Sequence, residues 1–529
     1  MSMSRNRLGA LAASAAAIAL VLSACSGGAS TSTESTTTET TVTTQGPTGT
    51  LTAGAAYETT NYHPSNTSSA LAMGTNWHVV EGLWEMEQAT GKIYKALSAA
   101  DDPVKVSDTE YEVTLRADAK FSDGTAVTAA DVVSSFERAT AEGNIYAGMV
   151  NFIDTVTAKD DTTVTITLNK PFGLVKERLA VVKIVPAALD DDTLTKLPVG
   201  SGPYKYESIS DTEIVATVNE YYNGDKPATV EKLVWKPIKD DTARTTAAQD
   251  GTIDVMENVP ADNAAILEAA GLTVERAQGF GLAFMLFNTN KAPFNDERVR
   301  QAFHYAIDTE KLVTNNMSGE AAAATSFLPE SHPNYHKAST VFTYDTEKAK
   351  SLLAEAGVTN LSITLLTTDH PWVANLAPQI KSDLEAAGVT VTIQSLASAA
   401  LYADNLDIDN PTFDVAVAPG DPSVFGNDPA LLLNWWLGDN VWTQKRSQWK
   451  NSDPEGFAQL QAIIDEAVTL EGDAQQAKWN EAFDLAASKA VTYPLFHRSL
   501  LTAYNGNKVQ NFTPIGMTGL NLLGATVTE

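Results

Sequence analysis

The stretch YEVTLRADAKFSDGTAVTAADVVSSFERA, residues 111–139, decides the fold of this chain. At its start, Tyr111, Val113 and Leu115 alternate with polar residues, and this period of two is typical of a half-buried strand. Asp123-Gly124 follows and predicts a turn, because glycine accepts a positive φ without steric cost. The first half of the stretch therefore predicts a strand that ends in a turn.

The second half of the same stretch predicts a capped helix. Thr128 stands three residues before Asp131, a spacing typical of a capping box at a helix start. Val132, Val133 and Phe136 then place apolar side chains along one helical face. Strand, turn and capped helix form a structural unit and by themselves carry no chemistry.

Read as a string, residues 111–139 closely resemble the signature of the family 5 solute-binding proteins of ABC importers, which include oligopeptide, dipeptide and nickel binders. The family pattern runs approximately Y-x-F-x-L-R, K-F-x-D-G-x-x-x-T-A-x-D-V and S-F-x-R. Two later strings resemble the same family: LPVGSGPY at 197–204 and FNTNKAPFNDERVRQAFHYAID at 287–308. The resemblance implies an α/β fold of the type II periplasmic-binding-protein class, with two hinged lobes and a small extra domain.

The 529 residues are too many for one core and predict two or three domains. Helices at 347–356 and 376–387 each end at a glycine and precede strands at 361–366 and 389–393, a repeat typical of a wound α/β sheet. With the resemblance, the expected divisions are a signal peptide at 1–24, a lipidated cysteine and disordered Ser/Thr tether at 25–48, lobe I at 49–91 and 199–289, an inserted small domain at 92–198, lobe II at 290–504, and a return to lobe I at 505–529.

The N-terminus predicts export and anchoring. Arg5 and Arg7 precede an apolar, alanine-rich run that is too short for a stable membrane span, as in a secretory signal peptide. The run ends in Leu22-Ser23-Ala24-Cys25, which resembles a bacterial lipobox and implies acylation of Cys25. Because Cys25 is the only cysteine, no disulfide is expected. We expect an extracytoplasmic lipoprotein on the outer face of the cell membrane.

Charge and motifs exclude several function classes. The net charge of −29 excludes a general nucleic-acid binder, which needs a basic face. The chain carries no hydrolase elbow, zinc-protease motif, P-loop or dinucleotide fingerprint, so we expect no enzyme and no cofactor. His332 and His336 lie four residues apart, but Pro333 denies them a helix, so we expect no metal site.

The expected ligand site combines an acid, a histidine and three tryptophans. Gly420-Asp421 lies in a segment that resembles the family's G-x-x-x-D-x-x-x-D-P, and in peptide binders the first acid pairs with the ligand's α-amine. His370 lies where dipeptide-binding relatives place an arginine for the ligand's carboxylate, and no arginine stands near it in the sequence. The predicted substrate-binding residues are Asp421, Trp435, Trp436, Trp442 and His370, whereas Trp449 is expected in the core.

The function that this resemblance implies is capture of a peptide between the two lobes and delivery to the permease subunits of an ABC importer. Hinge crossings are expected near 288–291 and 504–507, and a monomer is expected. Two alternatives stay open. One is a receptor for a nickel chelate, haem, a sugar or an opine-like compound, and the other is a surface adhesin or enzyme on the same scaffold.

Overall fold

The computed structural model describes residues 46–528. The predicted signal peptide, Cys25 and most of the predicted tether lie outside these residues. Among the residues that it does describe, no helix has the length and apolar character needed to cross a bilayer.

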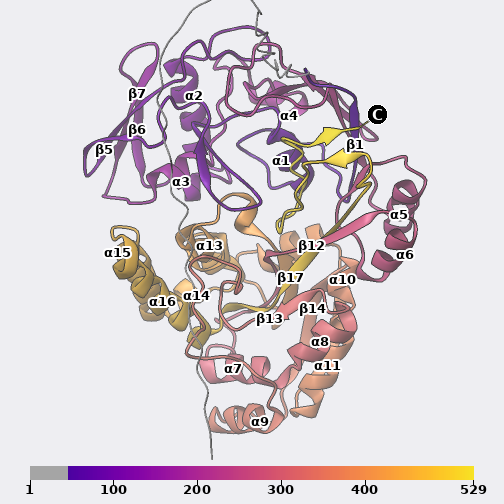
Figure 1. Cartoon of the computed structure of the whole chain (residues 1–529). Helices are drawn as coiled ribbons and strands as arrows, with labels where there is room; N and C mark the ends of the chain where they lie inside the picture. The colour runs from indigo at the N-terminus through magenta and orange to yellow at the C-terminus, as the bar shows by residue number, and fades with distance from the viewer. Residues whose placement is uncertain (1–45, 529) are drawn as a thin grey trace, which may run out of the picture. The chain divides into compact units, whose positions relative to one another are not determined.

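A mixed sheet of eleven strands organises the described part of the chain (Figure 1). Its strands, in spatial order, are β15 (Thr390–Leu396), β14 (Ser362–Thr368), β16 (Val415–Gly420), β12 (Thr273–Phe287), β17 (Thr492–Tyr504), β11 (Val255–Met256), β1 (Thr50–Ala55), β10 (Lys232–Pro237), β9 (Ile214–Val218) and β8 (Tyr204–Ile209), with β13 (Ala321–Ala323) beside β17. We call the part around β1 and β8–β11 lobe I, and the part around β13–β16 lobe II.

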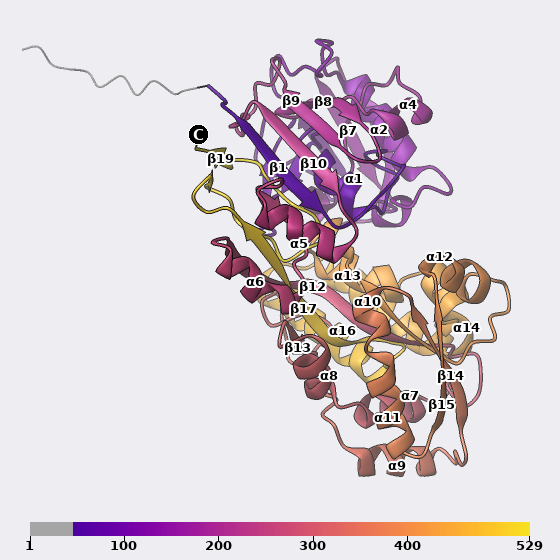
Figure 2. The ribbon, with the colours of Figure 1, turned by 90° about the vertical axis from the view of Figure 1, so that its right-hand side faces the viewer.

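The long strands β12 and β17 connect the two lobes. The two strands are 15 and 13 residues long and pair antiparallel. They run side by side in both views (Figures 1 and 2). The register of the pair shifts between Gln278 and Leu282, where two glycines flank Phe280. On one side of this shift β17 pairs with β11 of lobe I, and on the other side β12 pairs with β16 of lobe II.

The chain therefore crosses between the lobes inside β12 and β17, and the crossing positions expected at 288–291 and 504–507 are wrong. Asn288 is tied to lobe II, because its side-chain amide donates to the Pro411 carbonyl at 2.9 Å. The Asn505 amide donates to the Asp254 carbonyl of lobe I at 2.9 Å. The physical reason is that strand pairing continues through the crossing, which composition alone does not reveal.

Lobe II has the wound architecture that the glycine-ended helices predict. Helices α9 (Thr346–Glu355) and α11 (Ala377–Ala386) precede strands β14 and β15, which pair in parallel. Gly357 and Gly388 follow these helices with φ of +71° and +92°, the left-handed conformation that closes a helix end. The two predicted helices, the strand after each of them and the glycine that ends each helix are confirmed.

The expected strand, turn and capped helix lie in a small four-stranded sheet with a helix packed on it. The strands are, in order, β4 (Val104–Ser107), β5 (Glu110–Thr114), β7 (Thr163–Leu168) and β6 (Ile153–Ala158). Helix α2 (Ala129–Thr140) begins after Thr128, whose amide donates to the Asp131 carboxylate at 2.8 Å. The capping pair is confirmed, and Val132 and Phe136 are buried as predicted.

The remaining elements cover the sheets and connect them. They are α1 (Ala70–Asn76), α3 (Val175–Leu179), α4 (Asp191–Lys196), α5 (Asp241–Gln249), α6 (Ala264–Ala269), α7 (Glu297–Ala306), α8 (Thr309–Asn316), α10 (Pro371–Ala374), α12 (Ser398–Leu401), α13 (Pro429–Leu437), α14 (Trp449–Ser452), α15 (Pro454–Ala467), α16 (Gly472–Lys489), and the two-stranded pairs β2 (Trp84–Met86) with β3 (Ile93–Lys95) and β18 (Val509–Gln510) with β19 (Thr526–Val527).

The segment 515–522, near the C-terminus, contacts both lobes. The Gly519 amide donates to the buried Glu257 carboxylate of lobe I at 2.7 Å. The Thr518 amide donates to the Asp421 carboxylate of lobe II at 3.2 Å. A Cβ atom on Gly279 of β12 would collide with the Gly516 carbonyl group, so this segment packs tightly against the crossing point of the strands. It forms one wall of the space between the lobes.

Candidate functional site

A cavity of about 400 Å³ lies where β12 and β17 cross between the lobes, and we call it the cleft. Lobe I, lobe II, the two crossing strands and the C-terminal segment all contribute to its walls. The lining residues used below are Tyr57 and Met73 from lobe I, His370, Trp372, Asp421 and Val424 from lobe II, Gly281 and Leu282 from β12, Arg498 and Leu500 from β17, and Thr518.

Asp421 presents a carboxylate to the cleft that is held by uncharged donors. It follows the last residue of β16, and its Oδ1 accepts hydrogen bonds from the Ser423 amide at 3.3 Å and hydroxyl at 2.5 Å. Its Oδ2 accepts from the Thr518 amide at 3.2 Å and hydroxyl at 3.3 Å. Burial raises the pKa of the Asp421 carboxyl, and the hydrogen bonds from Ser423 and Thr518 oppose that rise. Asp421 therefore has a structural role, because it caps a turn, and its carboxylate also faces the cleft.

Arg498 brings a positive charge to the same cleft. Its guanidinium carbon lies 4.2 Å from the centroid of the Trp372 ring, in a cation–π contact. One terminal nitrogen donates to the Asn258 side chain at 3.3 Å, and the buried Nε has no acceptor. Burial lowers the pKa of Arg498, and the charges of Tyr57 and Asp421 oppose that change.

His370, which the sequence analysis predicts to bind substrate, lines the cleft beside this arginine. Its ring centroid lies 6.4 Å from that of Trp372, which in turn contacts Arg498. Burial lowers the pKa of His370, and the nearby charge of Arg498 lowers it further. The sequence indicated no arginine near this place, but the fold brings Arg498 there from β17. The fold thus places near His370 a cation that the neighbouring sequence lacks.

The sequence does hold a signal that could have found Arg498. Strand β17 reads TYPLFHRSLLTAY, and its alternation places Phe496, Arg498 and Leu500 on one face. An arginine between apolar residues in a strand requires either a buried partner or a ligand. Trp372 was missed for a different reason, because its packing under Arg498 depends on two segments that are distant in the chain.

Trp436 and Trp442 lie in the core of lobe II, and Trp435 is half-buried against it. None of the three lines the cleft, which corrects their assignment to it. Trp436 is 1% exposed, and its ring centroid lies 5.4 Å from that of Phe284. Trp442 is buried and also packs on Phe284, at 5.5 Å. Trp435 stacks on Phe425 at 5.1 Å. Trp436 and Trp442 thus face the sheet at β12, whereas Trp435 faces Phe425. Trp449 is buried as expected.

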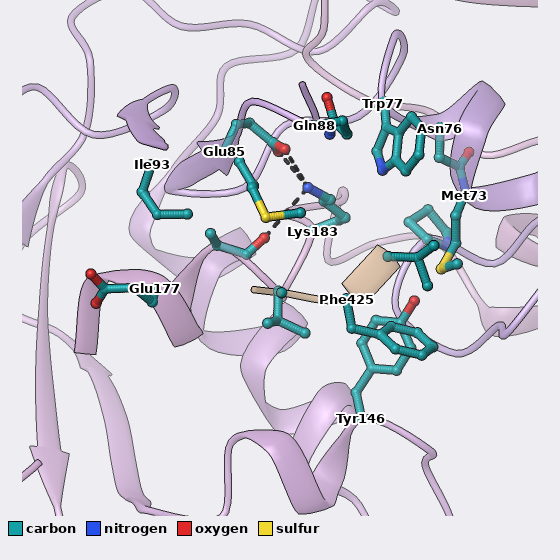
Figure 3. Close-up of a pocket in the computed structure, with 16 residues that line it drawn as sticks. Met73, Asn76, Trp77, Glu85, Gln88, Ile93, Tyr146, Glu177, Lys183 and Phe425 are labelled. Atoms are coloured by element: carbon teal, nitrogen blue, oxygen red, sulfur yellow. Dashed lines mark hydrogen bonds and ion pairs between the residues drawn. The ribbon is translucent and has the colours of Figure 1, made fainter. Parts of the chain in front are cut away.

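A second and smaller cavity, of about 40 Å³, adjoins the cleft and shares Met73 and Val424 with it. Figure 3 shows Lys183 pointing toward Glu85 within this cavity, and the Lys183 ammonium lies 2.5 Å from the nearer carboxylate oxygen. Tyr146 and Phe425 form an apolar wall opposite this pair (Figure 3). Lys183 and Glu85 neutralise each other, whereas Glu177, which also lines this cavity, has no ion-pair partner among residues 46–528. Burial raises the pKa of the Glu177 carboxyl.

A buried ion pair joins helix α3 to the start of α13 in lobe II. Arg178 of α3 donates from Nε and a terminal nitrogen to the two carboxylate oxygens of Asp428, at 2.8 and 2.9 Å. Both side chains are 5% exposed. Asp428 also caps α13, through the Leu431 amide at 2.9 Å. The second acid of the family-like segment therefore joins two parts of the chain and does not face the cleft.

Comparisons with known proteins agree with this architecture. The family described as bacterial extracellular solute-binding proteins, family 5 Middle, matches residues 95–443. The glutathione-binding protein GsiB of Pectobacterium atrosepticum is 30% identical over 326 residues, 59% of this chain and 62% of that protein, which is less than two thirds of its length. The probable D,D-dipeptide-binding periplasmic protein DdpA of Escherichia coli K12 is 26% identical over 446 residues, 79% of this chain and 84% of that protein.

A solved structure extends the likeness to the whole described fold. The ABC transporter-associated periplasmic binding protein DppA of Helicobacter pylori, in complex with the peptide STSA, matches with a TM-score of 0.77. The match covers 91% of this chain and 98% of that chain at 22% identity. It confirms the expected type II periplasmic-binding-protein fold. At this identity the likeness concerns the fold and does not assign a ligand.

Proposed function

We propose, from the premise that this chain belongs to family 5 of the bacterial extracellular solute-binding proteins, that it captures peptides in the cleft and delivers them to the permease subunits of an ABC importer. The observation that carries the peptide proposal is the Asp421 carboxylate, which faces the cleft and accepts hydrogen bonds only from uncharged donors among residues 46–528.

The chemistry of this carboxylate favours an ammonium ligand. Four donors from Ser423 and Thr518 fix the carboxylate in position, yet none of them neutralises its charge. An α-ammonium group would supply the missing charge and form a charge-assisted hydrogen bond, which is stronger than a neutral one. The remaining lining, with Met73, Leu282 and Leu500, suits side chains of varied shape.

Calorimetry with one peptide in two forms tests the role of Asp421. Losing one partner of a buried charge pair costs about 2–5 kcal/mol, much of it because the other charge is left unpaired. Asp421→Ala should therefore weaken binding of the free peptide by about a hundredfold or more. N-acetylation of the peptide should weaken binding to the unchanged protein to a similar degree, because it removes the ammonium.

The matched control for Asp421→Ala is Asp465→Ala, which removes an exposed acid on α15 outside the cleft. Asp465→Ala should leave peptide affinity unchanged. If the N-acetylated peptide binds as tightly as the free one, Asp421 does not bind an amine. The alternative function, a receptor for a non-peptide solute, is then favoured. Native mass spectrometry of protein purified from its own cell would then identify that cargo.

The proposed place of action is the outer face of the cell membrane. The sequence supports export through the signal-like run at 1–24 and a lipid anchor at Cys25, both of which lie outside the described residues. The Ser/Thr-rich composition that follows Cys25 supports the proposed tether between the anchor and the lobes. A monomer that opens and closes around one ligand suits this role, and no catalytic step is proposed.

A further inference from the structure

The smaller cavity beside the cleft, which we call the side cavity, contains one acid without a partner. Glu85 lines this cavity and is paired with Lys183 at 2.5 Å, whereas Glu177 of α3 forms no ion pair within the described part of the chain. The Glu177 side chain is half-buried. A carboxylate that is partly removed from water without a counter-charge is unfavourable, so this position suits a cation from outside the chain.

The cations next to Glu177 in the sequence are already engaged with other acids. Lys176 pairs with Asp102 at 2.8 Å, and Arg178 forms the buried pair with Asp428. Burial and the nearby charge of Asp428 raise the pKa of Glu177, and they outweigh the opposing effects of Lys176 and Arg178. Among these five groups one acid is therefore in excess, and that acid is Glu177.

The side cavity can be reached from the cleft. Met73 and Val424 line both cavities, so a group that is bound in the cleft can extend from one into the other. Figure 3 shows Met73 and Glu177 on opposite sides of the view, with Lys183 and Phe425 between them. Because the Lys183 charge is neutralised, a side chain that crosses this space meets mainly apolar walls before it reaches Glu177. It therefore needs an apolar stem and a charged tip.

The size of the side cavity suits the tip of one side chain. Its volume is about 40 Å³. One water molecule needs about 10–15 Å³ of such volume, so the cavity has room for about three waters. The ammonium group of a lysine, with its last methylenes, is compact enough to replace them, whereas the planar guanidinium of an arginine is wider.

We propose that the side cavity binds a lysine side chain of the cargo, with the ammonium at Glu177 and the stem against the apolar lining. This inference rests on the proposed peptide function and adds a side-chain preference to it. A lysine stem packs along apolar surface while its charged head reaches a polar group, which is the arrangement that the side cavity offers. An ammonium beside a carboxylate forms a charge-assisted hydrogen bond, and partial burial reduces the screening of this pair by salt.

The test is calorimetry of alanine tripeptides that carry one lysine or one norleucine, placed at each position in turn. Norleucine keeps the stem of lysine and lacks the ammonium. At one position or more, the lysine peptide should bind the unchanged protein about tenfold more tightly than the norleucine peptide, which corresponds to about 1.4 kcal/mol. Glu177→Gln should remove this preference. The matched control is Glu137→Gln, which changes an exposed acid on α2 that lines neither cavity and should keep the preference.

Three results would overturn the proposal. If lysine and norleucine peptides bind equally well at every position, the side cavity binds no cation, and the peptide function stands. If the preference for lysine survives Glu177→Gln, the ammonium is bound elsewhere in the cleft. If no peptide binds in any form, both the proposed function and this inference fail. Thermal unfolding reports whether Glu177→Gln folds, and if it does not, Glu177→Asp replaces it and should reduce the preference, because its carboxylate is one methylene shorter.

Discussion

At the scale of single residues, Asp421 combines two roles that oppose each other. Burial raises the pKa of its carboxyl above the ordinary value, so the folded protein holds a proton at a pH where the unfolded chain has released it. The charged form therefore costs stability above the raised pKa, and this cost is relieved as the pH falls through it. Ligand binding has the opposite sign, because an ammonium group requires the charged carboxylate.

This opposition predicts that peptide affinity falls on mild acidification. As the pH falls toward the raised pKa of Asp421, the ligand must displace a proton, and binding should weaken while the ligand's own ammonium stays charged. Calorimetry at several pH values below 7, in two buffers of different ionisation enthalpy, should detect proton release on binding. Asp421→Asn should bind weakly at every pH without proton release. An affinity of the unchanged protein that does not vary with pH would contradict this assignment.

At the scale of elements, helices α3 and α13 meet through the buried pair of Arg178 and Asp428. A bidentate pair that is 5% exposed on both sides is strongly sensitive to the loss of one partner, because the other charge stays buried. The same interface carries a second pair, between Lys170 and Asp465 of α15 at 2.6 Å, whose side chains are 46% and 60% exposed. The two pairs differ mainly in solvent access, which makes them a matched comparison.

We expect Asp428→Asn to destabilise the protein by about 3–5 kcal/mol if the interface stays closed, and by less if Arg178 becomes hydrated through opening. Asparagine is also a good helix cap, so the start of α13 should survive the change. Asp465→Asn, at the exposed pair, should cost about 0–1 kcal/mol. Urea unfolding of both variants measures the difference, and equal losses would show that the buried pair has no special role.

At the scale of the whole molecule, the described structure is a closed one. One continuous core contains Phe136 and Ile166 of the small sheet's domain together with Trp436 and Leu460 of lobe II. The cleft has walls from both lobes, so a ligand that fills it contacts both. The strands β12 and β17 are the connections about which the lobes can move.

Small-angle scattering should then show a smaller radius of gyration after peptide is added to ligand-free protein. Asp428→Asn should shift the ligand-free population further toward the open form, because it removes a bond that exists only when the interface is closed. The exposed-pair variant Asp465→Asn is the control and should behave as the unchanged protein. An unchanged radius of gyration, together with binding proven by calorimetry, would argue against closure.

The sequence by itself determined the local structure and the family. The alternation from Tyr111 to Leu115 and the spacing of Thr128 and Asp131 depend only on neighbours along the chain, and the strand and capped helix that they predict are present. Gly357 and Gly388 end their helices for the same local reason. Asp421 was found through a family-like string, and the structure places it in the cleft.

Only the tertiary structure decided which charges share the cleft and which aromatics leave it. Arg498 reaches His370 and Trp372 because β17 crosses the sheet beside β12, and this pairing joins segments far apart in sequence. Trp436 of α13 and Trp442, which follows that helix, are residues of a type that suits a ligand site, but long-range packing turns both onto Phe284 of β12 and buries them. Periodicity tells which residues share a face, and the fold alone tells what that face meets.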